Sequence, residues 1–227
     1  MAKGSVMIHP NMATLIGVIT TDANISKSVL QKVLSSCTEK TFNRTSVDGD
    51  TSVCDMVISL ANGMAENEKI DENSKAYDEF YQAYLHVCTE LAKMIAKDAE
   101  GATKLIEVRV NGAKSSEDAK KAAFAIAKSP LVKTAMFGQD ANWGRIITAL
   151  GYSGADFDPN KTDIHIGDLL VCKSGEAVAF DETHALEILK SDEILLSVKL
   201  NEGKFGDRVW TCDFSFDYVK INASYRS

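Results

Sequence analysis

The amino-acid sequence predicts an α+β fold, a layered α/β sandwich with mixed, largely antiparallel sheets. Apolar residues recur at helical spacing over 74–98, which is typical of one long amphipathic helix. Residues 105–110 alternate between apolar and polar side chains, as a half-buried strand does. Towards the C-terminus, two strand-like stretches at 193–200 and 205–221 flank a short turn at 201–203. Long helices combined with hairpin-joined strands favour layers of helix and sheet.

The first part of the chain predicts a strand followed by two helices. Residues 14–21 form an apolar run that ends at turn-forming residues, which is typical of a buried strand. Ser26 is the expected N-cap of a helix whose apolar positions fall within 29–34. Residues 56–60 predict a short helix that stops at Gly63.

The second part predicts helices and strands in alternation. A helix is expected over 116–127, because Pro130 prevents it from continuing far. Residues 142–150 predict another short helix. A strand over 163–172 and a helix over 183–190 complete the elements before the final hairpin.

Composition and charge exclude several classes of function. Lys and Arg number 25 against 32 Asp and Glu, which gives a net charge of −7 at pH 7. A surface for nucleic acid or anionic membrane needs clustered positive charge, so neither partner is expected. No apolar run approaches the roughly 18–20 residues of a membrane span, and the first residues lack the apolar stretch of a secretory signal. We therefore expect an intracellular protein, in the cytoplasm or in an organelle matrix.

The cysteines and histidines show no ligand pattern. The five cysteines are an odd number without a CxxC pair, and the four histidines are scattered. A disulfide framework or a zinc site would show even counts or short ligand spacings. We expect free thiols in a reducing compartment, no bound metal and no cofactor.

Thr14 is a candidate nucleophile on chemical grounds. It opens the first predicted strand, after a loop in which Gly4, Pro10 and Asn11 favour turns. A threonine hydroxyl needs a nearby base, and the residue's own α-amine, with a reference pKa of about 7.7–8.0, can serve once the preceding bond is cut. Small Ala13 leaves room for attack on its carbonyl. On the local pattern alone, a β-branched residue that starts a strand is the simpler interpretation.

Five segments of the chain carry a resemblance to a known family. They are Lys3-Gly4-Ser5 with Met7-Ile8 and Pro10-Asn11-Met12-Ala13-Thr14; Val47-Asp48-Gly49-Asp50-Thr51-Ser52; Glu100-Gly101-Ala102-Thr103-Lys104; Asn142-Trp143-Gly144-Arg145 with Gly151-Tyr152; and Asp217-Tyr218-Val219-Lys220-Ile221-Asn222-Ala223 with Tyr225-Arg226. In this order they resemble the ornithine acetyltransferase family of arginine biosynthesis, over nearly the whole chain. The resemblance implies the fold of a self-cleaving acyltransferase with an N-terminal threonine.

The resemblance implies a specific reaction. Precursors of this family cut themselves before a threonine, and the new N-terminal threonine takes the acetyl group of N-acetylornithine and passes it to glutamate. This is ping-pong acyl transfer, and some members also use acetyl-CoA as a donor substrate. By motif match, the cut falls between Ala13 and Thr14, and Thr14 is the catalytic nucleophile. The chain is then a glutamate N-acetyltransferase.

The same motif match implies the residues that bind substrate. Lys3 suits a substrate carboxylate, and Glu100 suits a substrate ammonium. Asn222 and the terminal Ser227 match the C-terminal binding pair of the family, and Thr14 itself contacts the acetyl group. Without the motifs, Lys3 is a solvated lysine near a terminus and Glu100 an exposed acid at a helix end.

The resemblance also implies segments and a partner. Residues 1–13 correspond to the end of an α chain with the cleavage loop, 14–115 to a nucleophile-bearing α/β core, and 116–227 to a C-terminal α/β subdomain. Family precursors carry an N-terminal half that becomes the α chain and supplies the oxyanion hole, in an assembly of α2β2 type. We therefore expect little transferase activity from the 227-residue chain alone. Val6 stands where the family commonly has glycine, and is expected to restrict the loop.

Two motifs are interpreted as structural. Asp48 and Asp50 fit turn and cap chemistry better than a catalytic carboxylate pair. Trp143 is expected to pack in the core, and Arg145 to pair with a buried acid. Two other functions stay open on this sequence: a threonine-dependent amidase or aminopeptidase with water as acceptor, and a non-catalytic truncated subunit.

Overall fold

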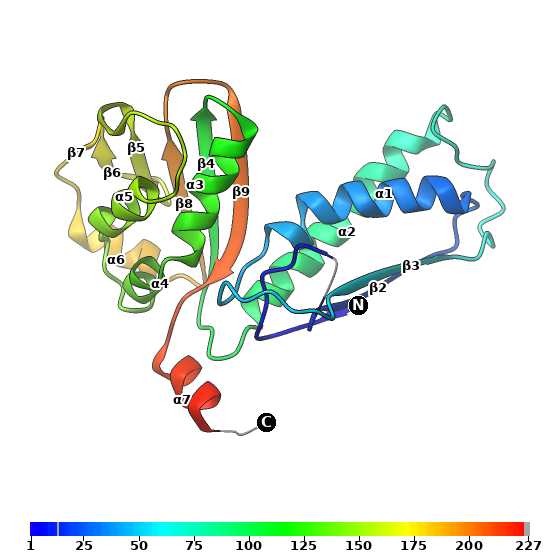
Figure 1. The fold of residues 1–227 in the computed structure, drawn as a ribbon, viewed down its shortest axis with the longest axis horizontal. Helices are drawn as coiled ribbons and strands as arrows, with labels where there is room; N and C mark the ends of the chain where they lie inside the picture. The colour runs from blue at the N-terminus through cyan, green and yellow to red at the C-terminus, as the bar shows by residue number, and fades with distance from the viewer. Residues whose placement is uncertain (13, 225–227) are drawn as a thin grey trace. The chain divides into compact units, whose positions relative to one another are not determined.

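A computed structural model describes residues 1–12 and 14–224. The chain divides into two compact units, Met1–Asp98 and Ala99–Ser227, each built on its own sheet (Figure 1). The expected boundary at 115/116 lies inside the second unit. The strand just before that boundary hydrogen-bonds to two strands from the C-terminal part of the chain, so that it belongs with them.

The first unit is a three-stranded sheet with two long helices. In the sheet order β1-β2-β3, β1 runs antiparallel to β2, and β3 runs parallel to β2. The helices pack against each other and against the sheet, as Figure 1 shows. The elements are β1 (Ala2–Lys3), β2 (Ile16–Thr21), α1 (Lys27–Lys40), the 3-10 turn η1 (Phe42–Arg44), β3 (Met56–Ala61) and α2 (Ala76–Lys97).

Local signals explain most of this unit. Ser26 caps α1 as predicted, because its side chain accepts a hydrogen bond from the amide of Val29 at 3.4 Å. Helix α2 matches the predicted long helix and buries one apolar stripe. The predicted helix at 56–60 is wrong, since these residues form β3. Their pairing partner lies 40 residues earlier, Ile16 opposite Met56, so no local pattern reveals it.

The second unit is a six-stranded sheet in the order β7-β6-β5-β8-β4-β9. In this sheet β4 and β8 pair in parallel, and every other pair of neighbouring strands is antiparallel. The predicted α+β class with mixed, largely antiparallel sheets is therefore confirmed. Helix α3 packs on β4, β9 and α5. The elements are β4 (Leu105–Ala113), α3 (Ser116–Lys128), α4 (Pro130–Phe137), α5 (Trp143–Gly151), η2 (Pro159–Lys161), β5 (Asp163–Ile166), β6 (Leu169–Lys173), β7 (Glu176–Ala177), α6 (Glu182–Lys190), β8 (Glu193–Lys199), β9 (Phe205–Cys212) and α7 (Phe216–Ser224).

Three predictions in this unit are corrected. The strand expected over 163–172 is a hairpin, β5 and β6, that turns at Gly167 with φ 60°. The strand expected over 205–221 ends at Cys212, and α7 follows. Pro130 does not merely end α3; it occupies the first turn of a new helix, α4, where its missing N–H costs nothing.

A helix that crosses a membrane is apolar over about 20 residues, and the helices of the described residues differ from this. None of them is both long and apolar enough to span a membrane.

Candidate active site

Thr14 lies in the first unit, exposed, two residues before β2. Its hydroxyl donates to the backbone carbonyls of Val6 and Met7, each at 2.9 Å. Its backbone N–H donates to Oδ1 of Asp55 at 2.5 Å. The nucleophile predicted from the sequence is therefore held at both its oxygen and its nitrogen.

Asp55 is a residue that the sequence analysis did not single out. It directly precedes β3, and its side chain is 6% exposed. Oδ1 also accepts the amide of Leu15 at 2.9 Å, whereas the buried Oδ2 has no hydrogen-bond donor among the described residues. An unsatisfied buried acceptor is destabilising by about 1–3 kcal/mol, which makes this atom unusual. In the sequence, Asp55 is marked only by its position between a polar loop and an apolar run.

The loop before Thr14 is held by the segment 47–52. The carboxylate of Asp48 accepts the amides of Met7 at 2.6 Å and Ile8 at 3.2 Å. It also accepts the amide of Asp50 at 3.1 Å, which confirms the predicted turn chemistry. The hydroxyl of Thr51 donates to the carbonyl of His9 at 2.9 Å. This acidic turn therefore fixes the segment on which the Thr14 hydroxyl rests.

The restriction expected from Val6 is not found at that position. In this loop it is Met7 that has a left-handed φ, 54°, whereas Val6 does not have a positive φ. An unbranched side chain tolerates this region better than a β-branched one. Valine at position 6 is therefore compatible with the loop conformation.

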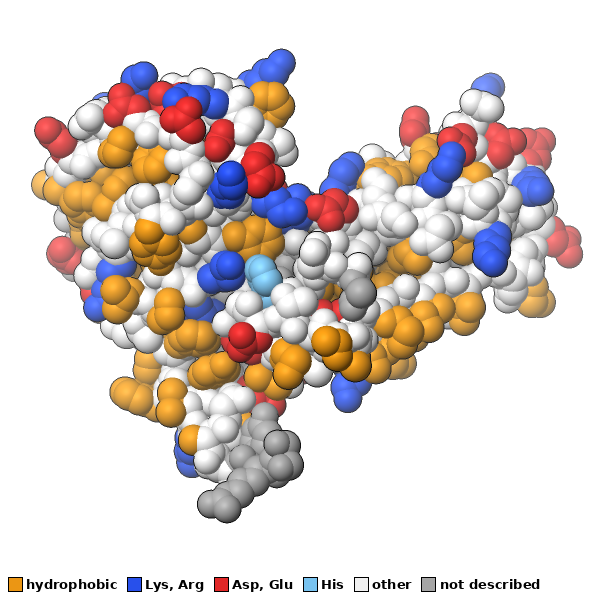
Figure 2. Space-filling model, viewed as in Figure 1, with side chains coloured by type: hydrophobic (Ala, Val, Ile, Leu, Met, Phe, Trp, Pro, Cys, Tyr) orange, Lys and Arg blue, Asp and Glu red, His pale blue; other side chains and the backbone are white. Residues whose placement is uncertain are grey.

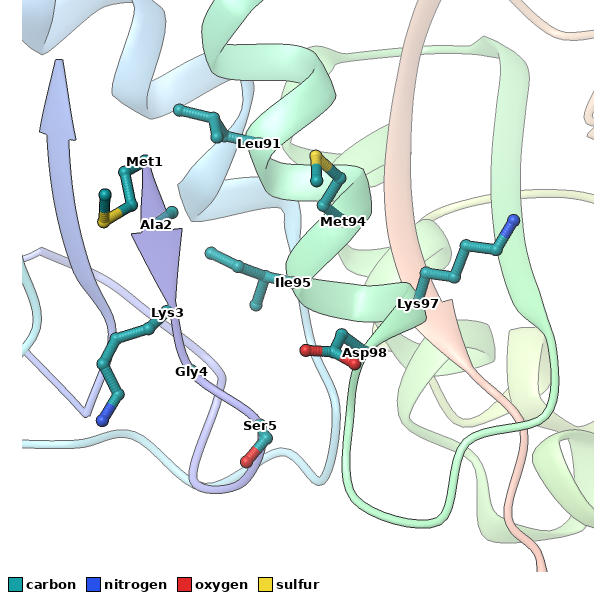
Figure 3. Close-up of a pocket in the computed structure, with 10 residues that line it drawn as sticks. All are labelled: Met1, Ala2, Lys3, Gly4, Ser5, Leu91, Met94, Ile95, Lys97 and Asp98. Atoms are coloured by element: carbon teal, nitrogen blue, oxygen red, sulfur yellow. The ribbon is translucent and has the colours of Figure 1, made fainter.

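Lys3 is exposed on β1, where it pairs with Ile16, two residues after Thr14. A cavity of about 600 Å³ lies between this N-terminal segment and α2. Lys3 projects from β1 on the side away from α2, so its ammonium does not point into that cavity (Figure 3). The cavity is lined by Met1, Ala2, Lys3, Gly4, Ser5, Leu91, Met94, Ile95, Lys97 and Asp98.

A second cavity, of about 410 Å³, adjoins Asp55. Its wall mixes amide and hydroxyl groups with apolar side chains, and Met12 is held there through its amide to Oδ1 of Asn43 at 3.2 Å. Its volume falls within the range of small-molecule pockets. It is lined by Met12, Gln31, Leu34, Ser35, Thr38, Asn43, Asp55, Met56 and Val57.

Glu100 and Asn222 lie in the second unit, and the structure brings them together. Nδ2 of Asn222 donates to Oε2 of Glu100 at 3.1 Å, across 122 positions of sequence. Both side chains are half-buried. Asn222 also donates to the carbonyl of Tyr218 at 3.0 Å, one turn earlier on α7.

The loop that carries Glu100 is anchored by a buried acid. Asp213 accepts the amides of Thr103 at 2.8 Å and Lys104 at 3.0 Å, and the Thr103 hydroxyl at 2.5 Å. Gly101 has φ 70°, and a Cβ there would meet the amide nitrogen of Tyr218 at 2.4 Å. Glycine is therefore required where the loop and α7 meet.

Some predicted residues fall elsewhere. Ala13 and Ser227 lie outside the described residues. Trp143 packs against the core of the second unit as predicted. The buried acid expected for Arg145 is wrong, because its guanidinium donates to the carbonyl of Leu131 at 2.8 Å and the hydroxyl of Thr134 at 3.2 Å. This segment thus supports α4.

Potential metal ligands do not cluster within residues 1–12 and 14–224. No group of three or more His, Cys, Asp or Glu side chains suited to a metal ion occurs there. None of the five cysteines is in a disulfide among the described residues, and Cys54 is the exposed one.

Comparisons with known proteins cover the whole chain. The model of the ArgJ family matches residues 1–227. A protein of Symbiobacterium thermophilum named arginine biosynthesis bifunctional protein ArgJ is 53% identical over 227 residues, which are 100% of this chain and 56% of that protein. A protein of the same name from Caldanaerobacter subterraneus is 54% identical over 100% of this chain and 57% of its own length. The chain thus spans little more than half the length of these relatives.

A solved structure has the same fold. The crystal structure of arginine biosynthesis bifunctional protein ArgJ from Bacillus halodurans superimposes with a TM-score of 0.90 at 47% identity. The match covers 92% of this chain and 99% of the solved chain. The solved chain is therefore close in length to this one, in contrast to the longer relatives above.

Proposed function

The chain belongs to the ArgJ family, and on that basis we propose that it is the nucleophile-bearing portion of a glutamate N-acetyltransferase of arginine biosynthesis. Thr14 takes the acetyl group of N-acetylornithine as an ester and passes it to glutamate. The observation that carries the proposal is the placement of Thr14, exposed and held by hydrogen bonds at both its hydroxyl and its nitrogen.

The nucleophile becomes competent by self-cleavage. The Thr14 hydroxyl attacks the carbonyl of Ala13, the chain moves from nitrogen to oxygen, and water hydrolyses the ester to leave Thr14 as a new N-terminus. The lengths of the relatives support this step. The solved family chain is covered to 99%, whereas proteins of the same name are covered to only 56–57%, as expected if the mature enzyme contains two polypeptides.

The α-amine of Thr14 is the general base. Both partners of the Thr14 hydroxyl are backbone carbonyls, which do not take up a proton near neutral pH. The amine released by the cut is attached two bonds from the carbon that bears the hydroxyl, and its pKa suits proton transfer near neutrality. No cofactor is needed for this chemistry, and acetyl-CoA would enter only as a second donor substrate.

The substrate-binding residues follow the charges of the substrates. Lys3 is proposed to bind a carboxylate and Glu100 an ammonium, with Asn222 orienting Glu100 through the 3.1 Å hydrogen bond. Ser227 is proposed to act with Asn222.

The proposed partner is the portion of the relatives that this chain does not cover. One face of the β2–β3 sheet presents exposed apolar side chains; we define this exposed sheet face as Ile16, Val18, Met56, Ile58 and Leu60. Hydrophobic side chains gather along the side of the first unit where β2 and β3 run (Figures 1 and 2). A patch of this kind marks an interaction site. We assign it to the N-terminal α chain, which supplies the oxyanion hole within an α2β2 assembly.

Intact-mass spectrometry tests the proposal. The chain, supplied with the N-terminal portion that its relatives carry, should yield a species that begins at Thr14 and should form N-acetylglutamate. Thr14→Ala should abolish both, and Thr14→Ser should retain some of each, because serine keeps the hydroxyl. Normal cleavage of Thr14→Ala would overturn the assignment.

The products separate the competing functions. Release of free acetate without N-acetylglutamate would indicate an amidase, whereas a chain that stays uncut and inactive with its partner would indicate a non-catalytic subunit. Without the N-terminal portion, the chain should turn over at least about 10²-fold more slowly, because the oxyanion donors are lost.

A further inference from the structure

We propose that Asp55 is a positioning residue that holds the nitrogen of Thr14, first as the scissile amide and then, after the cut, as the α-ammonium. This inference rests on the proposed function. It adds a residue that neither the motifs nor the charges of the substrates select.

The geometry fixes Asp55 against Thr14. Oδ1 accepts the Thr14 amide at 2.5 Å and the Leu15 amide at 2.9 Å, so one oxygen holds two successive N–H groups at the entry to β2. The next residue, Met56, donates its amide to the carbonyl of Leu15 at 2.8 Å. The parallel pairing of β2 with β3 thus sets the position of the carboxylate.

The second carboxylate oxygen of Asp55 indicates which form of the Thr14 nitrogen the site fits better. Oδ2 is buried and has no donor among the described residues. A peptide nitrogen has a single hydrogen, and in the uncut chain that hydrogen is already used by Oδ1. An α-ammonium has three hydrogens, so after the cut the same nitrogen can donate to both oxygens. The carboxylate is therefore better satisfied by the cleaved chain than by the uncut one.

Proton balance in self-cleavage shows what Asp55 contributes. The bond from Thr14 Oγ1 to the Ala13 carbonyl carbon forms while the bond from that carbon to the Thr14 nitrogen breaks. The hydroxyl proton ends on the nitrogen, and water later supplies the oxygen and hydrogen that convert the ester to a carboxyl and a free hydroxyl. As the amide nitrogen becomes an amine and then an ammonium, a carboxylate beside it stabilises the developing positive charge.

The same arrangement serves acyl transfer. The amine takes the Oγ1 proton as the hydroxyl attacks the acetyl carbonyl, and the resulting ammonium gives that proton to the departing amine of ornithine. Nucleophile, base and a third group that orients the base are the three parts of an activated hydroxyl. In this chain they are Thr14 Oγ1, the Thr14 nitrogen and Asp55.

Asp48 and His9, two ionisable residues near this site, have hydrogen-bond partners of their own. Asp48 accepts the amides of Met7 and Ile8. The ring of His9 lies 3.1 Å from the hydroxyl of Ser46. Lys3 lies on β1 opposite Ile16, and its side chain projects on the side away from α2 (Figure 3). Among the described hydrogen bonds, those of the Thr14 nitrogen involve the carboxylate of Asp55.

The test compares two aspartates of one loop, with the N-terminal portion of the relatives present. Asp55→Asn keeps an oxygen that can accept the amides but removes the charge. We expect self-cleavage to slow at least about tenfold, measured by intact mass against time. In the fraction that is cut, the acid limb of the transfer rate should move to lower pH by about one unit, since the ammonium loses its stabilising carboxylate. The matched control, Asp50→Asn, changes an exposed aspartate of the same loop and should alter neither measurement.

A second variant guards against loss of folding. Asp55→Glu keeps the charge but displaces it by one methylene, so cleavage should slow while the acid limb stays near its original position. Cleavage of both Asp55 variants at the original rate with an unmoved acid limb would overturn the inference, and would leave the proposed function intact if Thr14→Ala still failed to cut. Failure of the unsubstituted chain to cut would instead count against the proposed function.

Discussion

The two sheets of the molecule bury their apolar residues differently. In the second unit, β4 alternates, so that Ile106, Val108 and Val110 enter the core while Glu107 and Arg109 face the other way. In the first unit, the apolar residues of β2 and β3 lie on both faces. Leu15, just before β2, and Ile19 are buried, whereas the residues of the exposed sheet face are not. One sheet is complete within its unit, and the other leaves an apolar face exposed.

The polar face of β4 carries a network of polar contacts around the buried Trp210. Glu107 accepts hydrogen bonds from Arg109 at 2.5 Å and from the indole of Trp210 at 3.0 Å. The guanidinium of Arg208 lies 4.7 Å from the centre of the Trp210 ring. No comparable polar network covers the exposed sheet face among the hydrogen bonds of the described residues. Strands that are apolar on both faces are typical of sheets covered on both sides, which supports the assigned partner.

The largest effect is expected from shortening a core leucine of the complete sheet. Leu196 on β8 is 0% exposed, and Leu196→Ala should lower the free energy of unfolding by about 2–5 kcal/mol. Leu60 on the exposed sheet face is 56% exposed, and Leu60→Ala should lower it by less than about 0.5 kcal/mol in the chain alone. Urea unfolding of the two variants measures the contrast. Equal losses would show that the two sheets are equally complete.

An intermediate effect is expected from the anchor of the Glu100 loop. Asp213→Ala removes the acceptor of three hydrogen bonds from Thr103 and Lys104 and leaves buried donors unpaired. The free energy of unfolding should fall by about 1–3 kcal/mol, and the Michaelis constant for N-acetylornithine should rise as the loop loosens. An unchanged Michaelis constant in a folded variant would separate this loop from substrate binding.

A charge on the exposed sheet face tests its partner directly. Leu60→Asp should weaken association with the N-terminal portion at least about tenfold, because an unpaired charge would be buried. The matched control is Leu131→Asp on α4, where the leucine is 57% exposed and lies outside the exposed sheet face. Calorimetric titration of both variants with the N-terminal portion gives the two affinities. If they fell equally, the exposed sheet face would not be the contact.

The smallest effect concerns pH and the polar face of β4. Burial raises the pKa of Glu107, but hydrogen bonds from Arg109 and Trp210 outweigh it and hold the pKa below its ordinary value. A carboxyl with a lowered folded-state pKa stabilises the fold above its unfolded pKa of about 4.3, and this contribution is lost as pH falls through the folded value. The stability difference between the original chain and Glu107→Gln should therefore be about 1 kcal/mol near pH 7 and shrink below pH ~4. A difference that grew on acidification would contradict the sign.

Local chemistry predicted the helices better than it predicted the strand partners. Ser26 and the apolar stripe of α2 were sufficient, because caps and periodicity are local. β3 was missed because its apolar residues do not alternate and its partner is distant in sequence. The start of α7 has a local signal in Ser215, whose hydroxyl accepts a hydrogen bond from the amide of Asp217 at 3.2 Å.

The residues of the candidate site also divide into those that local motifs select and those that only the structure shows. Motifs selected Thr14, Glu100 and Asn222, and the structure adds the contact between the last two. Asp55 and Asp213 were missed because each acts on amides 40 or more positions away, which no spacing in the sequence marks. Both are acids that hold a backbone segment carrying a predicted site residue.

The proposed function requires that Thr14 carries the acetyl group during transfer. This is tested by incubating the cut protein, assembled with the proposed N-terminal α chain, with N-acetylornithine in the absence of glutamate, and mapping the peptide that begins at Thr14 by mass spectrometry. We expect one acetyl group on the Thr14 oxygen, which leaves as N-acetylglutamate when glutamate is added. Formation of N-acetylglutamate by a protein whose Thr14 peptide never gains the acetyl group would contradict it.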